Sequence, residues 1–401
     1  MNTARRSALA ALLALLAACA TPPQQPRPAP LQRPLSADEQ RQLERHTRLR
    51  RAAPPRAHTL APAAQPMALA RAAAEPPFTW TLDGRTLTID DYLRRQPVTA
   101  LLVARGREVL VERYAFGRGP DHHYLSNSMA KSVLGLALGL ARAEGRIASF
   151  DAPLQTWLPE LQGTAYGRTS LRNLMRMGSG VRYHETYEPG DDSSRYRQAY
   201  VREGIVRAAR AFDEREQPQG SRFNYASIET ALAGAALQRA LGESLAAYLT
   251  PRLWQAIGAA APADWQTDPL GLDLAHCCLF AQPRDWLRLG IVLANDGRRP
   301  DDGQAVIDRE YLLEATDARR LDPPFRPRSG RWGYSDFFWV MPGPARRFAL
   351  LGVHGQAIFV DPAQRLVMVH LAAGAAARAD QTSLARERLA LWQGLLRGVA
   401  P

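Results

Sequence analysis

Ser126-Asn127-Ser128-Met129-Ala130-Lys131 runs without a break into the apolar segment 132–141. The chain contains 51 Lys plus Arg, and Lys131 is its only lysine. Arginine keeps its proton in proteins, whereas burial and neighbouring charge can bring a lysine close to neutrality. A Lys three residues after a Ser, at the start of a buried helix, therefore predicts a Ser-Lys nucleophile pair.

Length and composition are those of a soluble globular protein. The 401 residues suffice for one large domain or two closely packed ones, and 46% of them are apolar and 22% charged. The formal net charge is +12, but the arginines are scattered among acidic residues and form no basic arm. We therefore expect a solvated, Arg-rich surface and no nucleic-acid partner.

The first residues have the features of a targeting segment. Arg5 and Arg6 precede an apolar run, 8–18, that is too short to span a bilayer. The run ends in Leu16-Ala17-Ala18-Cys19, which resembles a bacterial lipobox and predicts a lipoprotein signal peptide over 1–18 with lipidation at Cys19. The alternative is an ordinary secretory signal. Ala20 follows the cysteine, and by resemblance to sorted lipoproteins this favours the outer membrane, facing the periplasm.

Residues 19–75 are predicted to form a disordered tether, because they are rich in Pro, Ala, Arg and Gln and poor in aromatic residues. Within them, the capping box that starts at Ser36 is consistent with a short helix to about Arg51. The only other cysteines, Cys277 and Cys278, are adjacent. We expect both to be buried small apolar groups, with no disulfide and no zinc site.

Strand patterns occur near both ends of the remaining chain. The runs 79–82 and 85–89 flank Asp83-Gly84, a strong hairpin signal, and 99–104 and 108–114 suggest a second hairpin. Alternating strands follow at 332–340, 347–353, 357–360 and 365–371, before a helix over 381–397. Residues 76–401 are thus predicted to form one α+β domain. Its antiparallel sheet is built from both terminal parts, about 76–127 and 283–401, with flanking helices.

The part between them, about 128–282, is predicted to be a mainly helical inserted lobe. Helical periodicity favours helices at 171–177, 228–241 and 245–257, and residues 182–199 are expected to form a long loop. Two further helices are expected in the last part of the chain, one after 283–286 and one over about 308–318.

Two stretches offer partners for the Ser-Lys pair. Tyr225 lies just before a predicted helix and could handle a proton, since a neighbouring ammonium would favour its phenolate. Its reference pKa of ~10 otherwise makes it a poor base. His354-Gly355 indicates a tight turn or strand edge, where Gly355 permits close approach of the backbone to a ligand.

Together these residues resemble a known family. Ser128–Lys131, Tyr225–Ser227 and 354–356 occur in the order and approximate spacing of the Ser-x-x-Lys, Tyr-x-Asn/Ser and Lys/His-Thr/Gly-Gly motifs of serine β-lactamase-like hydrolases. The stretches 151–159, 171–180 and 283–290 are also similar, and the resemblance covers roughly 95–400. It implies a β-lactamase/transpeptidase-like fold and a serine hydrolase activity.

The chain is most similar to the esterase and 6-aminohexanoate-oligomer hydrolase branch of that family. The third motif begins with His354 where β-lactamases and D,D-peptidases present a lysine to a substrate carboxylate, and the second ends in Ser227. Tyr187 matches a tyrosine that the oligomer hydrolases direct at the scissile amide, although it could equally serve packing alone. Gln356 departs from the family, which usually has Gly at this position.

The resemblance implies acyl transfer on Ser128. Lys131 and Tyr225 would share the proton transfers, with Tyr225 the better base for deacylation, and His354 would orient Tyr225 or the substrate. The N–H groups of Ser128 and Ala357 would bind the oxyanion. The expected substrates are carboxylic esters or linear amides, and no metal or cofactor is required. The alternatives are a penicillin-recognising D,D-peptidase or β-lactamase and a catalytically silent envelope protein.

Overall fold

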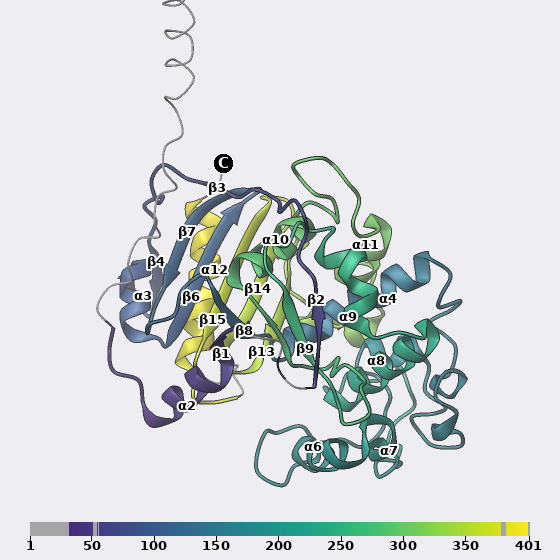
Figure 1. Cartoon of the computed structure of the whole chain (residues 1–401). Helices are drawn as coiled ribbons and strands as arrows, with labels where there is room; N and C mark the ends of the chain where they lie inside the picture. Colours follow the sequence, from purple (N-terminus) through teal and green to yellow (C-terminus); the bar gives the residue numbers. More distant parts are fainter. Residues whose placement is uncertain (1–31, 51–53, 55, 378–381, 400–401) are drawn as a thin grey trace, which may run out of the picture.

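Strands from both ends of the chain form one eight-stranded sheet (Figure 1). The computed structural model describes residues 32–50, 54, 56–377 and 382–399. The sheet is antiparallel except at one edge, where β3 lies parallel to β7. In spatial order its strands are β11 (Gly333–Ser335), β12 (Phe338–Val340), β13 (Phe348–Gly352), β14 (Gln356–Asp361), β15 (Leu366–Ala372), β6 (Val98–Arg105), β7 (Glu108–Tyr114) and β3 (Ala70–Arg71). The predicted α+β class and the sheet built from both terminal parts are confirmed.

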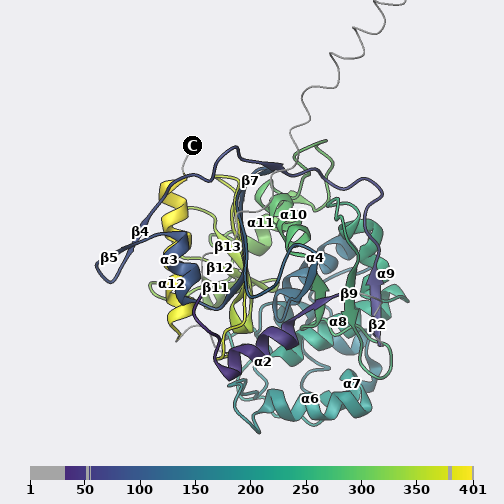
Figure 2. The ribbon, with the colours of Figure 1, turned by 60° about the vertical axis from the view of Figure 1, so that its left-hand side comes forward.

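Helices cover both faces of this sheet, because its central strands are apolar on both sides (Figure 2). Leu101 and Val103 pack with α3 (Ile89–Arg95), α12 (Ser383–Gly398) and the small hairpin of β4 (Trp80–Leu82) and β5 (Arg85–Leu87). Leu102 and Ala104 point the opposite way, into the core shared with α4 (Met129–Ala143) and α10 (Pro283–Ala294). The predicted first hairpin is thus present, but as a separate two-stranded sheet.

Most of the remaining helices form a lobe next to α4 (Figure 1). These are α5 (Leu171–Met175), α6 (Asp192–Glu203), α7 (Ile205–Ala209), α8 (Ser227–Leu241) and α9 (Leu245–Leu249), with α11 (Arg309–Thr316) following later in the chain. The predicted loop over 182–199 is wrong from Asp192 onward, because Asp191 caps α6 by accepting a hydrogen bond from the Ser194 N–H. The helix predicted at 245–257 consists of α9 and one π turn, Thr250–Trp254.

A second sheet, not predicted from the sequence, joins this lobe to the chain's N-terminal part. It has five strands in the order β1 (Thr47–Leu49), β8 (His122–Leu125), β10 (Leu279–Ala281), β9 (Ala263–Gln266) and β2 (Ala57–Leu60). β8 leads directly towards α4, so the candidate nucleophile lies where this second sheet passes the chain to a helix.

The prediction of a disordered tether is wrong for the described part of 32–75. Ser36 forms the predicted capping box with Glu39, and α2 (Ala37–His46) follows, ending five residues earlier than the predicted Arg51. β1 then pairs with β8, β2 with β9 and β3 with β7. These strands hold the segment on the domain because their backbone N–H and C=O groups form hydrogen bonds with strands of the domain. This pairing does not depend on the side-chain composition of the segment.

Cys19, the predicted lipidation site, and the predicted signal peptide over 1–18 lie outside the described residues. Among the helices that are described, none has both the length and the apolar character needed to cross a bilayer.

Candidate active site

The turn that carries Ser128 is fixed from two sides. Ser126 exchanges hydrogen bonds with Leu279 of β10, whose carbonyl accepts from the Ser126 N–H at 2.8 Å and whose N–H donates to the Ser126 Oγ at 3.2 Å. Asn127 has a left-handed backbone, φ 46°, and its Nδ2 donates to the Val353 carbonyl at 3.1 Å. A left-handed Asn is uncommon outside turns and persists here because both neighbouring elements hold it.

Ser128 occupies the N-cap position of α4, yet its side chain makes no capping hydrogen bond. Serine normally uses its Oγ at this position to accept from the first turn of the helix. Here the half-buried hydroxyl instead accepts from the Lys131 Nζ at 3.3 Å. Its backbone N–H donates to no acceptor among the described residues. Both groups are therefore available to a reacting carbonyl, and the positive end of the helix lies beside them.

Lys131 is buried, and three acceptors surround its ammonium group. Besides Ser128 Oγ, the Nζ donates to Ser227 Oγ at 3.0 Å and to the His276 carbonyl at 2.8 Å. Burial lowers the pKa of Lys131 to about 8, partly opposed by the negative charge of Glu185. A lysine with this pKa is neutral in a substantial fraction of molecules near pH 8, so it can accept the Ser128 proton.

Glu185 is a site residue that the sequence analysis missed. Its carboxylate accepts from the Ser227 N–H at 2.6 Å and from the Ser227 Oγ at 2.7 Å. Ser227 thus passes a hydrogen bond from Lys131 to Glu185. No local spacing relates Glu185 to Lys131, because they come from different elements. The available signal was Ser227 itself, since a hydroxyl that accepts from a lysine still has a proton to donate.

Tyr225 lies against the same ammonium group. The Lys131 Nζ is 5.3 Å from the centroid of the Tyr225 ring, which also stacks on Trp339 at 5.8 Å. Burial raises the pKa of Tyr225, and the charge of Glu185 raises it further, while a hydrogen bond with Ser128 lowers it. The expectation that the ammonium would favour the phenolate is therefore wrong, because desolvation raises the pKa and Lys131 is not among the groups that lower it. Tyr225 is a neutral phenol beside the nucleophile.

His354 contacts a partner from the N-terminal segment. Its backbone is left-handed, φ 61°, and its Nδ1–H donates to the Gly374 carbonyl at 2.7 Å. The ring lies 4.9 Å from that of His46, centroid to centroid. Burial lowers the pKa of both histidines, that of His46 to about 3, so both rings are neutral at pH 7. His354 lines the same cavity as Ser128, but the predicted role of orienting Tyr225 stays a prediction.

The rest of the third motif faces the interior. Gly355 has φ +94°, and a Cβ there would lie 2.9 Å from side-chain atoms of Ala372 and Leu384. These two contacts and the left-handed backbone both require glycine here, and the predicted approach of a ligand to the Gly355 backbone stays a prediction. The Gln356 side chain is buried and donates to the Ala372 carbonyl at 2.7 Å. Ala357 is buried in β14, and its predicted oxyanion role stays a prediction.

A cavity of about 950 Å³ opens over Ser128. Glu185, Tyr187, Ser227 and His354 share its lining, whereas Lys131 and Tyr225 are not among the lining residues. Tyr187 is half-buried, with its backbone N–H donating to Asp191 Oδ2 at 2.8 Å and its hydroxyl hydrogen-bonded to Glu185. The predicted Tyr187 is therefore placed in the cavity of the nucleophile.

Cys277 and Cys278 also line this cavity, and they form a disulfide with each other. The prediction of two buried, unbonded thiols is wrong on both counts, because the residues are half-buried and Cys278 adopts a left-handed backbone, φ 75°, within the turn. The bond lies between the His276 carbonyl that binds Lys131 and Leu279, which binds Ser126. Among the residues described, no group of three or more His, Cys, Asp or Glu is placed to hold a metal ion.

Comparisons with known proteins agree on one family and one fold. Residues 87–391 match the model of the family described as beta-lactamase. A 6-aminohexanoate-dimer hydrolase of Paenarthrobacter ureafaciens is 27% identical over 308 residues, which cover 72% of this chain and 77% of the relative.

Two solved structures illustrate the fold. A Bacillus anthracis protein described as a 6-aminohexanoate-dimer hydrolase superposes with a TM-score of 0.75 at 22% identity, over 86% of this chain and 92% of the other. A family VIII carboxylesterase superposes with a TM-score of 0.57 at 15% identity, over 76% and 93% of the two chains.

Proposed function

Because the chain belongs to the beta-lactamase family, we propose that it is a serine hydrolase that cleaves carboxylic esters or linear amides through an acyl-enzyme on Ser128. One observation supports this most: the buried Lys131 Nζ donates to the Ser128 Oγ at 3.3 Å, and its pKa is lowered to about 8. A serine with an adjacent, partly neutral lysine is an activated nucleophile.

Acylation starts with the neutral form of Lys131. As the Ser128 Oγ bonds to the carbonyl carbon, its proton moves to the Lys131 Nζ. The N–H groups of Ser128 and Ala357 then donate to the oxyanion. When the intermediate collapses, the bond to the leaving group breaks and the Tyr225 phenol supplies the proton that the leaving group needs. The Lys131 ammonium restores the proton of Tyr225, and neutral Lys131 deprotonates the water that later releases the acyl group.

Because Tyr225 is neutral, its role differs from that of the base for deacylation that the resemblance implies. A phenol whose pKa is raised by burial is a poor base but can donate a proton to an amine or alkoxide leaving group. Esters with good leaving groups need this proton less than amides do. Tyr225→Phe should therefore reduce amide hydrolysis by about 10³-fold and p-nitrophenyl ester hydrolysis far less.

We also propose that the mature chain is a lipoprotein of the bacterial outer membrane, anchored at Cys19 and facing the periplasm. The Leu16–Cys19 motif supports this. Metabolic labelling with an alkyne fatty acid should mark the wild type and not Cys19→Ser, whereas equal labelling of both would exclude this anchor.

A panel of one ester, one linear amide and one β-lactam tests the activity. We expect turnover of p-nitrophenyl butyrate and of a linear amide, and loss of both by at least about 10³-fold in Ser128→Ala. Ser193→Ala is the matched control, because Ser193 lines the same cavity but bonds Asp191 and has no lysine partner. Turnover of the β-lactam alone would favour the penicillin-recognising alternative.

A further inference from the structure

Two turns that come from different sheets carry the proposed oxyanion donors. The nucleophile turn, Ser126–Ser128, follows β8 of the five-stranded sheet, and the motif turn, Val353–Gly355, joins β13 to β14 of the eight-stranded sheet. In the described chain, no strand of one sheet pairs with a strand of the other. Two N–H groups that share one oxyanion must each lie about 2.7–3.1 Å from it. Strand pairing alone therefore does not set the separation that the reaction requires.

Each turn is held on its own sheet. The nucleophile turn is bonded to Leu279 of β10. In the motif turn, the Gly355 carbonyl accepts from the Nδ1–H of His370 in β15 at 2.7 Å. The Gly374 N–H donates to the His354 carbonyl at 3.0 Å. These bonds fix the shape of each turn, but they do not connect the two sheets.

The side chain of Asn127 connects the two turns. Its Nδ2 donates to the Val353 carbonyl at 3.1 Å, across a sequence separation of 226 residues. Among the hydrogen bonds between described residues, this is the only one that joins the nucleophile turn to the motif turn. Asn127 is buried and directly precedes Ser128, so the bond acts next to the nucleophile.

Gly352 brings the same two turns into contact from the opposite side. A Cβ at this position would lie 2.5 Å from the Ser126 carbonyl oxygen and 3.1 Å from the Asn127 Cβ. The backbone of Gly352 is extended, with φ −129°, so its conformation does not itself require glycine. The missing side chain instead allows the two turns to approach closely.

We propose that Asn127 is a positioning residue of the oxyanion hole: its amide holds the motif turn against the nucleophile turn, so that the N–H groups of Ser128 and Ala357 converge on one oxygen. This inference rests on the proposed function, since it places the reacting carbonyl at Ser128. Asparagine suits this position because it tolerates the left-handed backbone, φ 46°, and also supplies a hydrogen-bond donor.

Asn127→Gly tests the inference in the full-length protein, because glycine keeps the left-handed backbone and removes the amide. We expect kcat and kcat/KM for p-nitrophenyl butyrate to fall equally, by about 30-fold, since the lost alignment matters most when the oxyanion is charged. The apparent pKa of the base should stay near about 8, because Lys131 keeps its hydrogen bonds to Ser227 and the His276 carbonyl.

Phenylboronic acid provides a readout that a purely structural role would not change. In its adduct the Ser128 Oγ bonds to boron, the serine proton passes to Lys131, and the tetrahedral boronate places an oxygen where the oxyanion forms. Such transition-state analogues depend on the same donors as the reaction. The Ki should therefore rise by about 30-fold in Asn127→Gly, in parallel with the fall in kcat.

A second variant acts from the motif side. Gly352→Ala places a methyl group against the Ser126 carbonyl, so it should separate the turns and produce the same paired change in kcat and Ki. Circular dichroism and thermal melting show whether each variant is folded, and if Gly352→Ala does not fold, Asn127→Gly alone decides.

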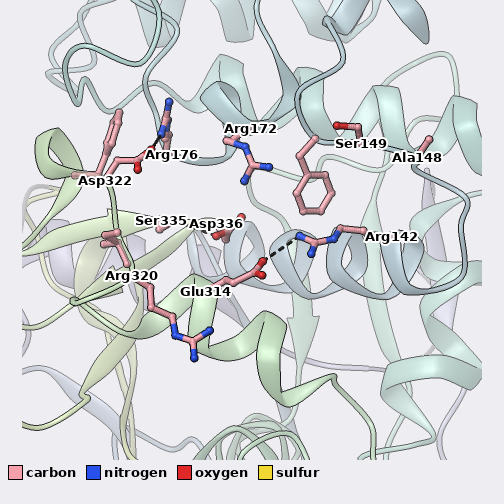
Figure 3. A pocket seen from close by; sticks show the side chains of 13 residues that line it. Arg142, Ala148, Ser149, Arg172, Arg176, Glu314, Arg320, Asp322, Ser335 and Asp336 are labelled. Atoms are coloured by element: carbon pink, nitrogen blue, oxygen red, sulfur yellow. Dashed lines mark hydrogen bonds and ion pairs between the residues drawn. The ribbon is translucent and has the colours of Figure 1, made fainter.

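Asp336→Gly is the matched control. Asp336 has the same left-handed φ of 46°, and its carboxylate accepts from the Ser335 Oγ of its own turn at 3.0 Å. It lines a second cavity, of about 350 Å³, which contains none of the proposed site residues (Figure 3). The control should change kcat and Ki by less than about twofold.

The two failures can be told apart. A folded Asn127→Gly with the kcat and Ki of the wild type would overturn the inference while leaving a serine hydrolase. A fall in kcat without a rise in Ki, or equal losses in Asp336→Gly, would overturn it as well. Absence of turnover and of boronate inhibition in the wild type would refute the proposed function and this inference with it.

Discussion

Lys131 is the residue on which the proposed chemistry depends, and its protonation sets the pH profile. Its pKa is lowered to about 8, so the neutral base is scarce at pH 6 and predominant at pH 9. We predict that kcat/KM for an uncharged ester rises with pH through an apparent pKa near 8. Lys131→Arg keeps the charge but cannot act as the base, and it should lose about 10³-fold in activity at every pH. Near-normal activity in this variant would contradict the assignment.

Glu185 should tune this profile through its charge. The carboxylate raises the pKa of Lys131 and is bonded to it through Ser227. Glu185→Gln removes the negative charge, so the ammonium is less favoured and the acidic limb of the profile should move to lower pH. Glu188→Gln is the control, since it alters a carboxylate of the same loop and cavity that makes no contact with Ser227. A limb that stays fixed or moves to higher pH would exclude this coupling.

The turn between β9 and β10 positions the base. Its disulfide, Cys277–Cys278, lies next to the His276 carbonyl that accepts from Lys131 at 2.8 Å. Reduction by a dithiol frees the turn, so we predict a several-fold, reversible fall in kcat and a changed apparent pKa of the base. Cys277→Ser/Cys278→Ser should be slow with or without the reductant. If both thiols become alkylatable while kcat and the apparent pKa of the wild type stay unchanged, the disulfide is not needed to position the His276 carbonyl.

Helix α8 contains a buried carboxyl group that should make stability depend on pH. Burial raises the pKa of Glu229 to about 8, although its Oε1 is hydrogen-bonded to Ser179 at 2.6 Å. The raised pKa means that the folded state keeps a proton that the unfolded chain loses near its ordinary value of ~4.3, so stability is lost as pH rises towards 8. Glu229→Gln should raise the free energy of unfolding by about 2 kcal/mol at pH 9 and little at pH 5. Urea denaturation at the two pH values measures this, and an equal effect at both would be evidence against it.

At the level of elements, the sequence patterns predicted the helices and strands whose positions follow from the local periodicity of apolar residues. Both hairpins, the strands of β13 to β15 and helix α4 follow from alternating or helical apolar spacing. Residues 332–340, predicted as one strand, instead form β11 and β12, which pair antiparallel. The five-stranded sheet was missed because its strands are three or four residues long and pair across distant parts of the chain, as in Thr47 with Tyr124. Composition misled at 32–75, where a Pro-rich segment is ordered by backbone pairing with the domain.

For the whole molecule, the difference between local spacing and long-range packing also separates the site residues that were predicted from those that were missed. Ser128 and Lys131 were predictable since they lie one helical turn apart, and Tyr225 since it begins a recognisable motif. Glu185 reaches the site because its loop packs against the first residue of α8, and Arg45 because α2 packs beside the cavity. No spacing in the sequence reveals either contact. The proposed catalytic centre thus lies in a cavity that is partly lined by the chain's N-terminal segment.

The covalent acyl-enzyme on Ser128 is the central claim, and intact-mass spectrometry after treatment with a fluorophosphonate tests it most directly. The account predicts one adduct per chain in the wild type, located on Ser128 by peptide mapping, and faster labelling at pH 9 than at pH 6. Ser128→Ala should remain unlabelled, whereas Ser193→Ala should label normally. An adduct of equal yield in Ser128→Ala, or none in a folded wild-type protein, would contradict the account.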